Sequence, residues 1–361
     1  NRSMSHDIYR QLAQRLDAVP NGFPATESGV ELRLLARLFT PEQARLAVVL
    51  RLTPEPAAEI APRAGMEPDA AHRALKTMAR QGLIRVEVRA REVRFALLPF
   101  VVGFWEAQRP RLDRELAELM EQYIHETRGG PMAVAPALQR VIPVGQSIDA
   151  GLEVFPYERA EALVEGAKSW AVGKCICREQ QRLLGKGCDA PEESCLWFAP
   201  VENAFRNDGD ARVLTKEEAL HLLAECEDAG LVHTALNQQD GIHYICNCCP
   251  CCCGILRGAI EFGHRAAVAG SAFRAVVDDD ACAGCGVCVE RCHFGALSLV
   301  DGYATIDDER CVGCGLCASV CPEEALQLER RPGAVPTPPK DESAWRALRA
   351  RERGMRLADI L

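Results

Sequence analysis

The cysteines restrict the fold of this 361-residue chain more than any other feature. All 19 lie between Cys175 and Cys321, and eight of them form two runs with the spacing C-x2-C-x2-C-x3-C, repeated with a period of 29 residues. Disulfides are rare in reducing compartments, where dense cysteine clusters are usually metal ligands. The sequence therefore predicts a metal-bearing C-terminal part that follows an N-terminal region without bound metal.

The spacing of the two runs suits iron–sulfur clusters. Three thiolates at x2 spacing can bind three corners of one cubane, while glycines such as Gly284 and Gly313 let backbone N–H groups approach the sulfides. The pattern resembles bacterial two-cluster ferredoxins over about sixty residues, which implies a ferredoxin-like domain at 270–330. By that resemblance one [4Fe–4S] cluster is held by Cys282, Cys285, Cys288 and Cys321, and the second by Cys311, Cys314, Cys317 and Cys292.

One residue departs from the ferredoxin pattern. Proline follows Cys321 as in that family, but His293 follows Cys292. We expect this change to alter the local turn, and with it the cluster potential, rather than the ligands. Two four-cysteine zinc sites are the alternative interpretation, but they would require neither the repeat nor the glycines.

Negative charge is concentrated in the same segment. Residues 276–329 contain eleven Asp or Glu and two Arg, a net charge of −9, which equals the formal charge of the whole chain. An acidic surface steers partners of opposite charge. We therefore expect a redox partner protein with a basic docking patch, with simple solubility as the alternative explanation.

A second group of cysteines precedes the two runs. Six cysteines within eight residues cannot all face one metal, because neighbouring side chains of an extended segment point in opposite directions. Cys226 lies inside a predicted helix and is interpreted as a packing residue. The other ten are predicted metal ligands, enough for one or two further sites: Cys175, Cys177, Cys188, Cys195, Cys246, Cys248, Cys249, Cys251, Cys252 and Cys253.

Thiolates select iron–sulfur clusters, zinc or copper(I). With two ferredoxin-type runs on the same chain, we expect one or two additional iron–sulfur clusters here, with zinc as the alternative and a redox-active dithiol or a haem-linked site after it. His233 and His243 lie close by in sequence and are weaker candidates for ligands. The order CxC-Arg, then CNCCxCCC, then the two runs resembles a group of anaerobe-type ferredoxin proteins, which implies electron transfer.

The region 1–125 has no cysteine and reads as helical with one hairpin. Helices are expected over 31–39, 41–52, 57–64 and 68–81, followed by two strands over 83–97. Helix, turn, helix and a charged hairpin resemble a winged helix. Because its basic excess is small for a DNA-binding surface, we expect protein docking, with nucleic-acid contact as the alternative.

The whole chain is predicted to be an α+β multidomain protein. It divides into a winged-helix-like domain (1–125), a connector (126–156), a mostly helical cysteine-rich domain (157–269), the ferredoxin domain (270–330), and a proline-rich spacer with a C-terminal helix (331–361). Helices are expected over 157–172 and from Thr215 to Gly230. The sequence shows no export signal, no apolar run long enough for a membrane span and no nucleotide-binding fingerprint, so a cytoplasmic location is expected.

These features favour a non-catalytic electron-transfer protein, either a dedicated ferredoxin partner or a subunit of an anaerobic oxidoreductase complex. The first alternative is an iron–sulfur redox sensor that regulates DNA binding through the winged helix. The second is a reductase that binds its substrate at the middle cluster, for which Glu225, His233 and His243 would be the acid–base candidates.

Overall fold

The computed structural model describes residues 2–148, 154–206, 209–333 and 337–357. The chain forms two compact units. The N-terminal unit comprises Asn1–Val134, Gln180–Lys186 and Arg346–Leu361, and the cysteine-bearing unit comprises Ala135–Glu179 and Gly187–Trp345. No helix among the described residues has the length and apolar character needed to cross a membrane.

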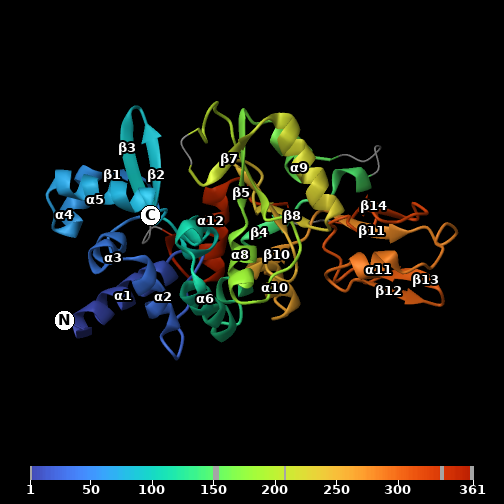
Figure 1. The fold of residues 1–361 in the computed structure, drawn as a ribbon, viewed down its shortest axis with the longest axis horizontal. Helices are drawn as coiled ribbons and strands as arrows, with labels where there is room; N and C mark the ends of the chain where they lie inside the picture. The colour runs from blue at the N-terminus through green and yellow to red at the C-terminus, as the bar shows by residue number, and fades with distance from the viewer. Residues whose placement is uncertain (1, 149–153, 207–208, 334–336, 358–361) are drawn as a thin grey trace. The chain divides into compact units, whose positions relative to one another are not determined.

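The N-terminal unit is mainly helical (Figure 1). Its elements in chain order are α1 (Arg2–Asp17), α2 (Val30–Leu38), α3 (Pro41–Val48), β1 (Glu55–Pro56), α4 (Ala57–Ala64), α5 (Pro68–Arg80), β2 (Ile84–Arg89), β3 (Glu92–Leu97) and α6 (Arg114–Glu126). Helix α3 begins at a Thr40 capping box with proline in its first turn, as the sequence predicts. The expected order of two helices and a hairpin is present, with β1 completing a three-stranded sheet in the order β1-β3-β2.

The C-terminal helix α12 (Glu342–Glu352) lies within the segment 331–361, where the sequence predicts a spacer followed by a helix. Its Arg349 is buried and donates hydrogen bonds to the carbonyl oxygens of Pro20 (2.8 Å), Val134 (2.5 Å) and Pro131. This part of the helix therefore packs on its own chain. The last part of the predicted helix, residues 358–361, lies outside the described residues.

The cysteine-bearing unit is built on a seven-stranded sheet with the strand order β10-β4-β8-β9-β6-β5-β7. All neighbouring strands are antiparallel except β10 and β4. The strands are β4 (Gln139–Val141), β5 (Ser169–Lys174), β6 (Glu193–Ala199), β7 (Ala211–Leu214), β8 (Val232–Leu236), β9 (Tyr244–Cys248) and β10 (Val268–Ala269). The helices of this part are α7 (Ala160–Glu165), α8 (Ile176–Leu183), α9 (Lys216–Asp228) and α10 (Gly254–Ile260).

Two expectations for this region are wrong. The region is not mostly helical, because the sheet forms its centre. The helix predicted over 157–172 ends after α7, and residues 169–174 form β5 instead. Its apolar residues suit a helical period, but Ala171 and Val172 are buried between β6 and β7, so tertiary packing overrides the local pattern. Part of the expected connector also joins the sheet, as strand β4.

Helix α9 matches its prediction. Thr215 and Glu218 form the capping box, and the helix packs on β5, β6 and β7. Cys226 is fully buried in the same apolar core as Leu196 and Ile245, which agrees with its interpretation as a packing residue. The sheet and α9 therefore provide a rigid base for the cysteines at the strand ends.

The C-terminal part of this unit consists of short strands around a second core. Strand β11 (Phe273–Val277) pairs with β14 (Leu326–Arg330), and β12 (Leu297–Val300) pairs with β13 (Tyr303–Ile306). Helix α11 (Val287–Arg291) lies between β11 and β12 in the sequence. Six of the eight cysteines of the two runs belong to this core or pack against it. Two of the six, Cys288 and Cys317, are buried in it. The loops that carry both runs are thus fixed on one small scaffold.

Candidate metal centres

Two cavities in the C-terminal part are each lined by four cysteines. The first has Cys282, Cys285, Cys288 and Cys321 in its lining, together with Val287 and Leu299. The second has Cys292, Cys311, Cys314 and Cys317 in its lining. The structure thus groups the eight cysteines as the ferredoxin resemblance implies. Their role as ligands is still a prediction.

Glycines hold the cysteine loops close to neighbouring backbone. A Cβ atom on Gly284 would lie 2.0 Å from the carbonyl oxygen of Gly302, and one on Gly313 would lie 2.1 Å from that of Phe273. Both glycines also have positive φ angles, +65° and +66°. A side chain at either position would displace the loop, so the cavities depend on glycine there.

The donor set and the cavities fit [4Fe–4S] clusters. Thiolate sulfur is the ligand that such clusters use, and each cavity offers four thiols. Burial raises the pKa of Cys288, and it raises the pKa of Cys314 to about 12. Neutral thiols are favoured at these positions until a cationic centre binds, so cluster binding would release protons.

The second cavity lies against the seven-stranded sheet region. The N–H of Val144 donates to the carbonyl oxygen of Cys314 at 2.9 Å, and the hydroxyl of Ser147 donates to the carbonyl oxygen of Gly315 at 2.9 Å. The lining of the first cavity instead includes Val287 and Leu299, which are 41% and 45% exposed. The two cavities therefore differ in their surroundings, one against the sheet region and one near the surface.

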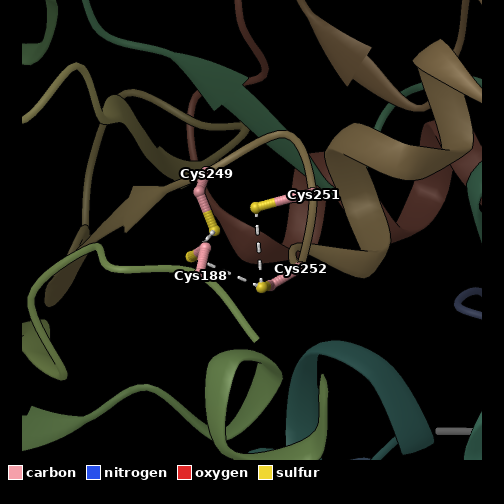
Figure 2. Close-up of side chains that lie close together, drawn as sticks. All are labelled: Cys188, Cys249, Cys251 and Cys252. Atoms are coloured by element: carbon pink, nitrogen blue, oxygen red, sulfur yellow. Dashed lines mark hydrogen bonds between the residues drawn. The ribbon is translucent and has the colours of Figure 1, made fainter. Parts of the chain in front are cut away.

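Four thiols upstream form a compact group, here called the four-thiol group: Cys188, Cys249, Cys251 and Cys252. Their Sγ atoms all lie within 4.8 Å of one another, and Figure 2 shows the four side chains converging. The Sγ of Cys188 is 3.8 Å from that of Cys249 and 3.7 Å from that of Cys252, and Cys251 and Cys252 are 3.7 Å apart. The group joins the loop after α8 to the turn after β9.

The turn after β9 explains how adjacent cysteines face the same way. Residues 250–252 leave the strand in a turn that the N–H of Cys253 closes on the carbonyl oxygen of Cys249 at 3.2 Å. In an extended segment Cys251 and Cys252 would point in opposite directions. The sequence predicts thiols in two directions, and the turn decides which ones meet.

The other six thiols form a closed ring, here called the six-thiol ring. Each member shifts the pKa of two others, in the order Cys175, Cys177, Cys253, Cys248, Cys246, Cys195 and back to Cys175. Strand pairing contributes directly, since β6 and β9 place Cys195 opposite Cys246. The ten predicted ligands thus divide into a group of four and a ring of six.

Polar side chains contact the sulfurs of the six-thiol ring. The Nε2 of Gln139 donates to the Sγ of Cys246 at 3.8 Å, and the hydroxyl of Thr234 lies 3.4 Å from the Sγ of Cys248. Hydrogen bonds from Cys246 and Cys253 lower the pKa of Cys248 to about 6. Such donors stabilise thiolate charge, which is what a soft metal centre requires.

A buried arginine lies between the two groups. The guanidinium of Arg178 donates to the carbonyl oxygens of Pro191 (2.7 Å) and Asn247 (2.6 Å) and to the hydroxyl of Ser194. Burial lowers its pKa, but Cys175 and Cys249 outweigh this effect and raise it. In turn, a hydrogen bond from Cys252, together with Arg178, lowers the pKa of Cys249 to about 5. A buried cation is costly unless paired, and here thiolates of both groups supply the opposite charge.

The two histidines considered as ligands are engaged elsewhere. His233 is buried, with its Nδ1 2.5 Å from Oδ1 of Asn247 and its Nε2 3.1 Å from Oε1 of Glu227. His243 contacts the carbonyl oxygen of Gly241 at 3.1 Å. The contributions of Gln139 and Thr234 are not apparent from the sequence, since neither residue lies near a cysteine along the chain. Arg178 directly follows Cys177 in the sequence, and this position could have indicated that its side chain lies near the cysteines.

Comparison with known proteins supports the C-terminal part alone. Residues 275–328 match the family described as a 4Fe-4S dicluster domain. No curated protein and no solved structure matches the chain. The matched domain and the cysteine groups indicate an iron–sulfur protein with a role in electron transfer.

Proposed function

We propose that the protein transfers single electrons for an anaerobic oxidoreductase complex, as a subunit or as its dedicated ferredoxin partner. The observation that carries the proposal is the pair of four-cysteine cavities inside the segment that matches the dicluster domain. When bound, each [4Fe–4S] cluster would accept and release one electron at a time. Cys282, Cys285, Cys288 and Cys321 would hold the first cluster, and Cys292, Cys311, Cys314 and Cys317 the second.

The surface near the first cavity supports docking of a partner there. Cys285 is exposed, and Val287, Leu299, Val300 and Tyr303 are large apolar residues with 41–50% of their surface exposed. Asp279 and Asp280 are exposed near the start of the first run. Apolar contacts surrounded by charge are typical of transient docking surfaces. We therefore propose that a partner protein with a basic patch exchanges electrons at the first cluster.

The surroundings of the second cavity support a continuation toward the six-thiol ring. Its cysteine loop is hydrogen-bonded to the sheet region, and strands β6 and β9 of the same sheet carry Cys195 and Cys246. We propose that the six-thiol ring holds one further iron–sulfur cluster. Its thiols and the donors Gln139 and Thr234 fit such a centre.

The test uses the full chain, purified without oxygen. Replacing Cys314 with Ala should remove about four irons per chain, because one cluster loses a ligand, and should abolish electron transfer from a chemical reductant to an acceptor protein. Iron analysis and electron paramagnetic resonance of the reduced protein measure the cluster loss. Arg73→Ala, on the exposed face of α5, is the control and should change neither quantity.

Two outcomes would contradict the proposal. A wild-type protein that binds about eight irons or more but passes no electrons to any acceptor would exclude the electron-transfer role. If Arg73→Ala abolished transfer while the iron content was unchanged, the N-terminal unit rather than the first cluster would control the exchange.

A further inference from the structure

The two sets of cysteines on this chain differ in geometry. The eight cysteines of the C-terminal runs line two cavities, four cysteines in each. The thiols of the four-thiol group instead converge, and theirs is the one set in the described part of the chain whose ligand atoms all lie within 4.8 Å of one another. The same fold thus contains two sets of four cysteines that line cavities without such convergence and one tight group of four.

The distances in the four-thiol group match a single metal ion. A regular tetrahedron with Zn–S bonds of about 2.3 Å has S···S edges of about 3.8 Å. Three of the six edges are 3.8 Å from Cys188 to Cys249, 3.7 Å from Cys188 to Cys252, and 3.7 Å from Cys251 to Cys252, and the other three are no longer than 4.8 Å. The thiolates of a cubane bind four different iron atoms and point outward from its corners, so their sulfurs stand much farther apart. The group leaves no room for a cubane between its sulfurs.

We propose that Cys188, Cys249, Cys251 and Cys252 hold one tetrahedral zinc ion, a centre distinct from the iron–sulfur clusters. Four protein ligands leave no open position, as in structural zinc sites. At equal geometry thiolates bind Zn²⁺ more tightly than Fe²⁺. The zinc would fix the loop after α8 to the turn after β9, which are 61 residues apart in the sequence.

The surroundings of the group suit a site with negative charge. Four thiolates around Zn²⁺ carry a net charge of −2, which needs a compensating donor nearby. The positive charge of Arg178 interacts with Cys249, and its guanidinium is held in place by the carbonyl oxygens of Pro191 and Asn247. A donor held behind a ligand in this way orients the ligand and offsets its charge. This zinc site does not depend on the proposed electron-transfer function, because zinc carries no electrons.

The experiment measures zinc and iron per chain in the full protein purified anaerobically. Wild type should contain about one zinc. Cys188→Ser should lose it without loss of iron, because Cys188 belongs to neither cavity nor to the six-thiol ring. Cys226→Ser is the matched control, a buried cysteine outside every group, and should retain both metals.

X-ray absorption at the zinc edge tests the proposal even if the variant does not fold. Wild type should show four sulfur neighbours at about 2.3 Å and no iron neighbour. A zinc signal dominated by nitrogen or oxygen would identify an adventitious ion and overturn the proposal. The proposal would also be overturned if wild type contained no zinc and Cys188→Ser lost iron. A loss of one iron would indicate a mononuclear iron site, and a loss of about four irons would indicate a cubane.

Discussion

Single glycines decide whether the cysteine loops can take their positions. Gly284 lies between two cysteines of the first run, where the backbone adopts a φ of +65° and the carbonyl oxygen of Gly302 leaves no space for a Cβ atom. Two separate costs follow, the strain of a positive φ and the steric overlap. Gly263 in the same unit has a positive φ but no steric overlap. The cost of backbone strain and the cost of steric overlap can therefore be measured separately.

Gly284→Ala should remove the first cluster, since the loop must move away from Gly302 to relieve the 2.0 Å contact. The iron content should fall by about four per chain. Gly263→Ala is the matched control, because Gly263 has a φ of +72° but a Cβ atom there would meet nothing within 4 Å. That control should lower the free energy of unfolding by only about 1–2 kcal/mol and keep all iron. Equal iron loss in both variants would show that backbone strain alone disrupts the loop.

At the scale of elements, the end of α9 is joined to the loop of Cys292. Arg291 donates to the carbonyl oxygens of Glu227 (2.7 Å) and Asp228 (2.8 Å), and the Nε2 of His293 is 2.6 Å from the carbonyl oxygen of Gly230. Carbonyl groups at a helix C-terminus lack partners within the helix, and cationic side chains there also suit its dipole. Proline, which the ferredoxin pattern has after this cysteine, could not make the contact of His293.

His293→Ala should therefore loosen the junction between α9 and the second cavity without removing a ligand. We expect the free energy of unfolding to fall by about 1 kcal/mol, the usual contribution of one hydrogen bond, with iron content unchanged. Denaturant unfolding of the cluster-loaded protein measures the change. His243→Ala replaces an exposed histidine and should have a smaller effect. A loss of iron in His293→Ala would mean that this residue supports ligation and not only the junction.

At the scale of the whole molecule, the negative charge is concentrated in the C-terminal domain. Residues 276–329 carry the same net charge of −9 as the entire chain, so the remainder is balanced. Most of these acidic side chains are exposed. Long-range attraction of this kind increases encounter rates more than it tightens complexes, and salt screens it.

Asp279→Asn combined with Asp280→Asn should slow electron transfer to a basic acceptor such as cytochrome c by about 3- to 10-fold at low ionic strength. The difference from wild type should shrink as salt is added, because screening removes the steering. Stopped-flow kinetics over a range of salt concentrations measures both effects. The control, Glu165→Gln with Glu202→Gln, removes the same charge from exposed positions outside the domain. An equal rate loss in the control would mean that net charge, and not the acidic surface, sets the encounter rate.

The sequence by itself determined the features that depend on local spacing. The spacing of the two cysteine runs carries the resemblance to ferredoxins. That resemblance implies that Cys282, Cys285, Cys288 and Cys321 form one set and the other four a second, and the structure groups them in that way. The cap and proline at Thr40-Pro41 and the capping box at Thr215 predict the starts of α3 and α9, because a cap involves residues only a few positions apart. The packing role of Cys226 followed from its place within a helix.

The tertiary structure alone decided how the ten upstream cysteines divide. Cys188 meets Cys249 across 61 residues, and Cys195 meets Cys246 through the pairing of β6 and β9. No local sequence period encodes such contacts, because they depend on the order of the strands in the sheet. Strands β5 and β6 of this sheet are short apolar segments. Such segments suit a helix or a strand equally well in isolation, and only burial between neighbours selects the strand. The same packing placed Arg178 between the two thiol groups, where its charge offsets that of the thiolates.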